Sequence, residues 1–288
     1  MKGIVWLASY PKSGNTWFRV FLTNLLRDCD EPANINELDG GPIASSRAVF
    51  DDLMGFEASD LTADEIDRLR PELYIQMAKE KDEEGPLFVK VHDAYTDVGE
   101  ERPLIPAEAT AGALYFIRNP LDVAVSFAHH TGSDYDTAIS GMADERFAVC
   151  GKPHRLYNQL RQKLLSWSGH VLSWCDRPPF PVCVLRYEDM KSQPLETFEK
   201  AAAFAGLKHG AEQIQKALNF SSFEVVRKQE ETEGFRERKS PSSLFFRKGR
   251  TGSWREELDE KQAQRVVDDH REVMRRFGYL DETGKIVY

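Results

Sequence analysis

The chain has 288 residues, of which 41% are hydrophobic and 30% are charged, and its formal net charge at pH 7 is −9. This length and composition suit one globular α/β domain with a large core. The acidic balance argues against nucleic acid as a partner, and since no run approaches the length of a membrane span, we expect no association with a membrane.

The four cysteines lie at positions 29, 150, 175 and 183, without a C-x-x-C pair. Scattered cysteines are typical of reduced thiols, which favours a cytoplasmic location. The apolar run that begins at Gly3 leads directly into a polar loop, so we expect no secretory leader.

The first predicted elements are a strand over Gly3–Ser9, a tight loop over Tyr10–Gly14 and a helix from about Asn15 to Asp28. This order directs backbone N–H groups and the positive end of a helix at one point, where Lys12 adds a full charge. Three short side-chain donors accompany it: Ser13, Asn15 and Thr16. We therefore predict a phosphate-binding loop.

This loop differs from the Walker P-loop, because Lys12 precedes Gly14 and no glycine begins it. In the helix that follows, Trp17 lies one turn from the loop, where its ring could stack on a base. The apolar stripe of the helix predicts that Arg19 and Arg27 face solvent.

Residues 30–60 are rich in Pro, Gly and Asn, and we expect an irregular segment of functional importance. Thr62 and Glu65 then form a capping box for a short helix that should stop before Pro71. The charged stretch Glu80–Gly85 is interpreted as a surface turn.

Pro86–Val91 is the second predicted strand, and Lys90 and His92 lie at its carboxyl end. Ligands of open α/β sheets bind at the carboxyl ends of strands, which is also where Lys12 lies. Residues two apart in a strand share a face, so Lys90 and His92 can reach one ligand. A lone histidine is more often structural, but this position favours a function.

The third predicted strand, Ala111–Ile117, ends at Arg118 and is followed by a helix with Asn119 as N-cap and Pro120 as first residue. Arg118 and Ser126 are candidate ligands of a phosphate. Taken alone, the stretch equally fits an arginine paired with Asp122 and a serine on a helix surface.

Two adjacent histidines, His129 and His130, follow this helix. Adjacent side chains on a helix point apart and no partner has metal-ligand spacing, so we expect no metal site and leave open whether either assists in an acceptor pocket. Residues 127–155 are predicted to form a second irregular insertion on the acceptor side, and Leu156–Cys175 a long helix.

The last part of the chain begins with a fourth predicted strand, Pro181–Leu185, which leads to Tyr187. Helices are expected at Pro194–Ala205, Ala211–Phe220 and Leu258–Phe277. Ser221 and Phe223 precede a polar segment, residues 228–250, that we interpret as a lid. This segment includes two cations and a glycine that can converge on one phosphate: Arg247, Lys248 and Gly249.

Five separated motifs occur between residues 10 and 254: YPKSGNTW, KVH, RNPLDVAVS, YEDM and RKGRTGSW. In their sequences and order they resemble the motifs of cytosolic-type sulfotransferases, which use 3′-phosphoadenosine 5′-phosphosulfate (PAPS). The resemblance implies a P-loop-type parallel β-sheet flanked by helices on both faces, as a single α/β domain over residues 1–288.

The resemblance also implies roles for the residues. His92 would be the general base, Lys12 would neutralise the leaving phosphate, Lys90 would hold the sulfonate, and Ser126 would engage Lys12 and the 3′-phosphate. The donor, with 3′-phosphoadenosine 5′-phosphate (PAP) as product, would be bound by these and by a larger set: Ser13, Gly14, Asn15, Thr16, Trp17, Arg118, Tyr187, Ser221, Phe223, Arg247, Lys248 and Gly249.

Three departures from the family pattern bear on function. Asn15 replaces a threonine, and Asp93 follows His92 where an apolar segment is usual, which predicts a more polar acceptor. The segment after Trp254 lacks the K-x-x-x-T-V-x-x-x-E dimer motif, so the oligomeric state stays open.

The sequence therefore predicts transfer of a sulfuryl group from PAPS to a hydroxyl of a small-molecule acceptor, without a metal ion. The acceptor's identity is open between alcohol, phenol, sugar and natural-product scaffold. Two alternatives are a P-loop small-molecule kinase, which the displaced Lys12 disfavours, and a catalytically silent PAPS- or PAP-binding protein.

Overall fold

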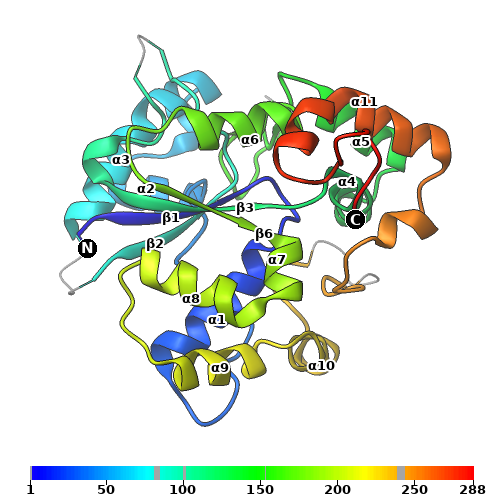
Figure 1. Ribbon diagram of the computed structural model, residues 1–288. Coiled ribbons are helices and arrows are strands. Elements are labelled where there is room, and N and C mark those ends of the chain that lie inside the picture. The colour runs from blue at the N-terminus through cyan, green and yellow to red at the C-terminus, as the bar shows by residue number, and fades with distance from the viewer. Residues whose placement is uncertain (1, 81–84, 100–101, 153, 239–243) are drawn as a thin grey trace.

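A parallel sheet forms the centre of the computed structural model, which describes residues 2–80, 85–99, 102–152, 154–238 and 244–288 (Figure 1). Within these residues the sheet has four strands in the order β2–β1–β3–β6, and every neighbouring pair is parallel. The strands are β1 (Ile4–Ser9), β2 (Leu87–Val91), β3 (Thr110–Ile117) and β6 (Val182–Arg186). β4 (Ala148–Val149) and β5 (Gln162–Lys163) form a small antiparallel pair apart from it.

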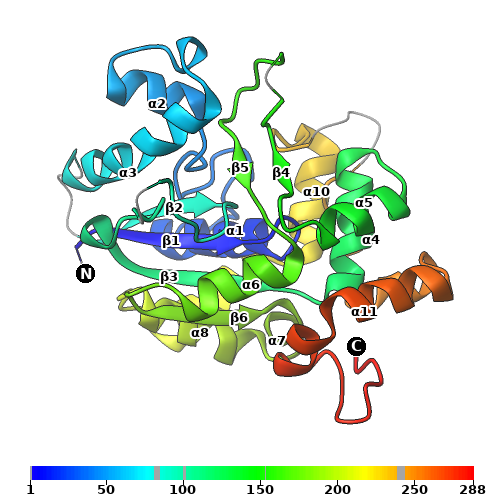
Figure 2. The same cartoon turned by 90° about the horizontal axis from the view of Figure 1, so that it is seen from above.

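Helices cover both faces of this sheet, as Figure 2 shows from above. The α-helices are α1 (Asn15–Arg27), α2 (Arg47–Met54), α3 (Ala63–Glu80), α4 (Pro120–Thr131), α5 (Tyr135–Ala143), α6 (Trp167–Asp176), α7 (Tyr187–Ser192), α8 (Pro194–Phe204), α9 (Ala211–Phe220), α10 (Phe223–Glu233) and α11 (Glu260–Arg276). Short 3₁₀ helices lie at η1 (Ala58–Asp60), η2 (Ala107–Ala109) and η3 (Ser253–Glu256).

The alternation of side chains along β1 divides the core into two layers. Trp6 packs with Tyr74 of α3 and with the tryptophans of α6 on one face. Val5 and Leu7 pack on the other face with aromatic rings of α1 and α8, among them Phe18 and Phe198. Because both faces are covered, all six residues of β1 are buried. The predicted α/β fold with helices on both faces is confirmed.

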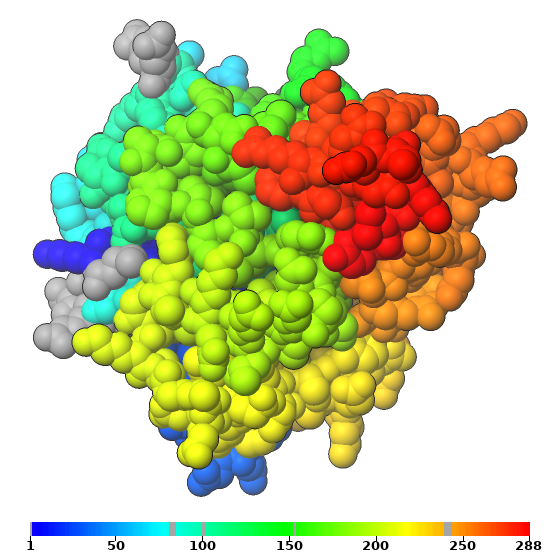
Figure 3. All heavy atoms as spheres, in the orientation of Figure 1, coloured from blue at the N-terminus to red at the C-terminus, as the bar shows by residue number. Residues whose placement is uncertain are grey.

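The C-terminal helix closes one side of the molecule. α11 contacts α4, α5 and α6, and Figure 3 shows it and the residues after it, in orange to red, as one continuous part of the surface. Trp254 Nε1 donates to the carbonyl oxygen of Tyr288 at 3.1 Å. Among the described helices, none has both the length and the apolar character needed to cross a membrane.

Two predicted helix boundaries are wrong. α3 continues through Pro71 to Glu80, because Leu73 and Tyr74 are fully buried in the core and their packing outweighs the hydrogen bond that proline removes. The helix predicted from Leu156 begins only at Trp167, where Ser166 is the N-cap. The residues before it include β5, whose backbone pairs with β4.

The two predicted irregular insertions are also partly helical. Residues 30–60 contain α2, capped by Ser46, and residues 127–155 contain the end of α4 and all of α5, capped by Asp134. Each of these N-caps accepts a hydrogen bond from the backbone N–H three residues on. Part of the expected surface turn (81–84) and part of the expected lid (239–243) lie outside the described residues, and the lid segment begins within α10.

Candidate active site

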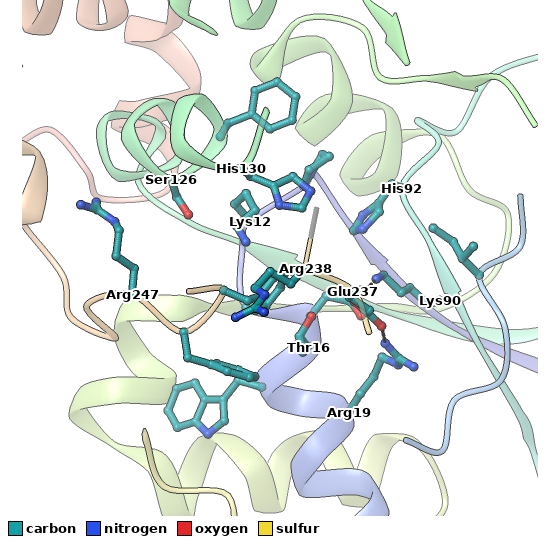
Figure 4. Close-up of a pocket in the computed structure, with 18 of the residues that line it drawn as sticks. Lys12, Thr16, Arg19, Lys90, His92, Ser126, His130, Glu237, Arg238 and Arg247 are labelled. Atoms are coloured by element: carbon teal, nitrogen blue, oxygen red, sulfur yellow. Dashed lines mark hydrogen bonds and ion pairs between the residues drawn. The ribbon is translucent and has the colours of Figure 1, made fainter. Parts of the chain in front are cut away.

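A cavity of about 920 Å³ lies where the strands of the sheet end. Lys12 follows β1, His92 follows β2 and Arg118 follows β3, and all three line it. Figure 4 shows Lys12 and His92 together with side chains from α1, α4 and the segment after α10. The carboxyl edge of the sheet is therefore the binding edge, as expected for an open parallel sheet.

The loop after β1 turns sharply into α1. Lys12 has φ 72° and Gly14, the N-cap of α1, has φ 104°. A Cβ on Gly14 would lie 2.8 Å from the ring of Tyr187, so glycine is needed both for the turn and for this close approach. Lys12 Nζ lies 3.6 Å from the ring centre of Phe245, within the range of a cation–π contact.

The predicted donors of this loop do not all face the cavity. Lys12, Gly14, Asn15, Thr16 and Trp17 line it, whereas Ser13 is 1% exposed and is not among the described lining residues. The Asn15 side chain donates from Nδ2 to the carbonyl oxygen of Leu7 at 2.8 Å, so it braces β1. Its contribution to the cavity is therefore chiefly its place at the start of α1.

Aromatic rings gather beside the first turn of α1. The ring centres of Trp17 and Tyr187 are 5.9 Å apart, and Phe223 also lines the cavity. Trp17 Nε1 donates to the carbonyl oxygen of Ser221 at 2.9 Å. The Ser221 hydroxyl is buried and donates to the carbonyl oxygen of Ala217, so the expected contact of this hydroxyl with a nucleotide requires the side chain to rotate.

Arg118 joins the first and last basic motifs. Its guanidinium lies 4.3 Å from the ring centre of Tyr187 and donates to the carbonyl oxygens of Lys12 and Arg250, at 3.2 Å each. The carboxylate of Asp122 is 3.8 Å away, so the ion pair considered from the sequence is present as a longer contact. Arg118 thus reaches segments 106 and 132 residues away in the chain.

Asp122 fixes this junction from α4. Its carboxylate accepts hydrogen bonds from Gly252 N at 2.8 Å, Ser253 Oγ at 3.0 Å and Trp254 N at 3.1 Å. Because Asp122 is 1% exposed, these charge-assisted bonds form in a dry environment, where they are strong. The segment that carries the RKG sequence is therefore tied directly to the helix that follows Arg118.

The cations of that segment line the cavity beside acidic partners. Arg247 lies 2.8 Å from Glu257, and Lys248 lies 2.9 Å from Glu256 and 2.7 Å from Glu257. Figure 4 shows Arg247 and Ser126 on one side of the cavity. The Arg247 and Lys248 side chains are 32% and 28% exposed, whereas Glu257 is 12% exposed, so water and a phosphate can reach the two cations more readily than their shared acidic partner.

His92 is held by β1. Its Nδ1 lies 2.8 Å from the carbonyl oxygen of Ser9, and since a carbonyl can only accept, Nδ1 carries the proton and Nε2 is the unprotonated nitrogen. Burial and then the nearby Lys90 charge lower the pKa of His92 to about 3. His92 is therefore a neutral imidazole at neutral pH, with a free lone pair on Nε2.

The model of the sulfotransferase domain family matches residues 2–278 of this chain. The chain belongs to the sulfotransferase family. Among curated relatives, luciferin sulfotransferase of Photinus pyralis is 27% identical over 272 residues, which are 88% of this chain and 67% of the relative. Sulfotransferase 6B1 of Homo sapiens is 25% identical over 269 residues, which are 93% of this chain and 75% of that relative.

Solved structures with the same fold include mouse sulfotransferase SULT7A1 complexed with PAP, at a TM-score of 0.58 and 20% identity over 96% of this chain and 84% of that one. Retinol dehydratase in complex with androsterone and PAP superposes at a TM-score of 0.62 and 22% identity, over 94% of this chain and 80% of that one. Together with the parallel sheet, these likenesses confirm the predicted fold of a sulfotransferase.

Two residues of this sulfotransferase site escaped the sequence analysis. Arg19 was expected to face solvent, but it is 6% exposed and its Nη1 lies 2.5 Å from Glu237. Glu237 also lies 2.9 Å from Lys90 Nζ. The position of Arg19, one turn after Asn15 on the same helix, was a usable signal. Nothing in the sequence around Glu237 distinguished it from the other acidic residues of its segment.

In the sequence, Asp93 predicts a more polar acceptor, but the position of Asp93 in the structure does not support that prediction. Asp93 is 1% exposed and forms two hydrogen bonds with Arg70 of α3, at 2.9 and 2.7 Å, so it faces the core and not an acceptor. The two histidines of α4 separate as expected. His130 lines the cavity of the sulfotransferase, whereas His129 lies outside the described lining and contacts Glu257 at 2.7 Å.

Metal ligands were not expected in this sulfotransferase. Within the described ranges, no group of three or more His, Cys, Asp or Glu side chains is placed to hold a metal ion. All four cysteines are free thiols.

Proposed function

We propose that this sulfotransferase transfers the sulfuryl group of PAPS to a hydroxyl of a small-molecule acceptor, with His92 as general base. The observation that carries the proposal is Arg118, whose guanidinium joins the Lys12 loop to the basic segment at Arg250 around one cavity. Cations from two separate segments that line one cavity together with aromatic rings suit a nucleotide with two phosphate groups.

The charges of the cavity support this donor. Among the described lining residues eleven are Lys or Arg and only Glu237 is acidic, in a chain whose net charge is −9. PAPS carries about four negative charges, since a phosphate monoester contributes up to about two at neutral pH. PAP is also the nucleotide named in the complexes of mouse SULT7A1 and retinol dehydratase.

We assign the donor contacts as follows. The 3′-phosphate would be bound by Arg118, Ser126, Arg247, Lys248 and the backbone at Gly249, and the 5′-phosphate by Lys12 and Thr16. The adenine would lie between Trp17, Tyr187 and Phe223. Three other predicted ligands would act indirectly: Asn15 by bracing β1, Ser13 from beneath the cavity wall, and Ser221 through its carbonyl oxygen, which accepts a hydrogen bond from Trp17.

The reaction step needs only groups present at this site. The acceptor oxygen attacks sulfur and forms the new S–O bond, the bond from sulfur to the 5′-phosphate oxygen breaks, and Nε2 of His92 takes the acceptor proton. Lys12 neutralises the charge that grows on the departing phosphate, and Lys90 holds the sulfonate oxygens. Alignment and charge stabilisation supply most of the rate, as in phosphoryl transfer.

The acceptor is proposed only as a class. Androsterone and retinol are named as ligands of retinol dehydratase, which favours a small molecule. The cavity lining also includes a run of polar residues, however, with Arg155, Tyr157, Gln159 and Gln162. We therefore favour a polar hydroxylated acceptor. The cytoplasmic location stays a prediction.

The experiment is donor binding and turnover with His92→Ala. We expect PAP to raise the melting temperature of both proteins equally, and sulfuryl transfer to fall by roughly 10²–10⁴-fold in the variant, the usual contribution of a general base. His129→Ala is the matched control and should transfer normally. Normal turnover by His92→Ala would show that the base is misassigned, and stabilisation by ATP with no response to PAP would favour a kinase.

A further inference from the structure

Two cations near His92 are already occupied by a carboxylate of the chain itself. Arg19 of α1 and Lys90 of β2 approach the two oxygens of Glu237, at 2.5 and 2.9 Å. Figure 4 shows Glu237 between them, with His92 beyond Lys90. All four residues line the same cavity.

The two cations form a built site and not a pair of surface charges. The Arg19 side chain is 7% exposed and that of Lys90 12%, whereas Glu237 is 30% exposed. Arg19 Nε is buried without a hydrogen-bond partner among the described residues. A buried arginine with a spare donor has more binding capacity than its present partner uses.

The three residues differ in how they are held. Arg19 lies on the helix packed beneath the sheet, and Lys90 lies on a strand of that sheet. Glu237 follows Gly234, the residue that ends α10, and has no helix or strand around it. The cations are therefore fixed, and the carboxylate is the partner that can leave.

These cations are separate from those assigned to the nucleotide phosphates. Arg118, Arg247 and Lys248 make their contacts with Tyr187, Glu256 and Glu257. Among the described residues, Arg19 and Lys90 instead form their ion pairs with Glu237. The Arg19–Lys90 pair lies instead at the end of β2, where the base is. An anion bound there would lie beside the reacting hydroxyl.

We propose that Arg19 and Lys90 form an oxyanion site beside His92, and that Glu237 is an internal occupant that a substrate oxyanion displaces. The inference rests on the proposed function. The ligand chemistry is a sulfonate or carboxylate group. Its source is either the sulfonate of the donor or an anionic group on the acceptor. The displaced Glu237 returns to water, which its present exposure allows.

The test is Glu237→Gln, measured by calorimetric binding of PAP and of PAPS. PAP lacks the sulfonate, so if the donor fills the site the variant should bind PAPS about tenfold more tightly and PAP as before, since one competing charge-assisted contact is removed. Arg19→Gln should have the reverse effect: it should weaken the binding of PAPS and leave the binding of PAP unchanged. Glu231→Gln, which removes an exposed partner of Arg227 on α10, is the matched control and should change neither.

A second arm tests the acceptor as source, with PAP-loaded protein and two probes of similar shape, 4-hydroxybenzoate and 4-hydroxybenzyl alcohol. If the acceptor fills the site, Glu237→Gln should tighten binding of the benzoate alone and leave the PAPS-to-PAP ratio unchanged. Equal affinities in wild type and variant for all four ligands would overturn the inference, because Glu237 would then be a permanent structural partner. If wild type binds neither nucleotide, the proposed function fails as well.

Discussion

The ring of Phe223 lies directly against the backbone of Gly249. A Cβ built on Gly249 would come 2.2 Å from this ring, and the residue has φ 59°, a left-handed conformation. The glycine of the RKG sequence is therefore required twice, once for the turn and once for the contact with a residue of the proposed adenine pocket.

We predict that Gly249→Ala weakens PAP binding by at least about tenfold, because the left-handed conformation alone costs a non-glycine residue about 1–2 kcal/mol and the Phe223 ring must also move. The measurement is titration with PAP. Gly210→Ala is the control, since a Cβ at Gly210 meets nothing within 4 Å. Unchanged PAP affinity in Gly249→Ala would mean that this segment does not touch the nucleotide.

The second prediction concerns the pH profile. The pKa of His92 is lowered to about 3 by burial and the Lys90 charge, so the basic form persists through the acid range. We expect kcat/KM to show no loss attributable to His92 between pH 8 and pH 6. A base with the ordinary pKa of 6.5 would lose about fourfold over that interval. A fourfold loss of kcat/KM between pH 8 and pH 6 in the wild type would contradict the assigned environment of His92.

The lowered pKa of His92 also makes the free energy of unfolding depend on pH. Because the folded pKa of His92 lies below its unfolded value, the unfolded chain binds more protons below about pH 6.5, and the free energy of unfolding falls as pH decreases. His170, which is fully buried, has its pKa lowered by burial to about 4 and adds to this effect. His170→Gln should reduce the pH slope of the unfolding free energy by about 1.4 kcal/mol per pH unit near pH 5.

The fourth prediction concerns the buried pair of Asp93 and Arg70. Asp93→Asn should lower the free energy of unfolding by about 3 kcal/mol, the lower end for a broken buried pair, because Asp67 lies 3.6 Å from Arg70 and keeps part of its charge compensated. PAP binding should not change, since Asp93 faces the core.

Urea denaturation measures this effect, and Asp97→Asn is the matched control. Asp97 pairs with Arg177 at 2.7 Å, but both side chains are exposed, so its replacement should cost about 1 kcal/mol or less. Comparable losses in the two variants would show that the burial of Asp93 does not govern its contribution.

The parts of the site that sequence could predict are those set by local signals. Lys12, His92 and Arg118 each follow an apolar run, and the rule that ligands bind at the carboxyl ends of parallel strands brings them together. Asn119 acts as the N-cap of α4, as its residue type indicates, because a cap depends only on its immediate neighbours.

The missed parts depend on distant chain segments. Arg19 is buried because Glu237, 218 residues later, comes to lie beside it. The apolar residues between Leu156 and Cys175 fit a helix by spacing, yet Gln162 and Lys163 pair with β4 instead. Asp93 differs from an acceptor-side residue only through Arg70 of α3. In each case the partner, and not the local pattern, decides the outcome.

The hydrogen bonds of Asp122 also bear on how the protein is made. They connect α4 with residues 130 to 132 positions later in the chain. During synthesis, a nascent chain that has completed the sheet at Arg186 still lacks the segment that Asp122 holds, until residues 252–254 have been made. If that segment binds the nucleotide as proposed, nucleotide can stabilise the folded chain by mass action only after these residues have been added.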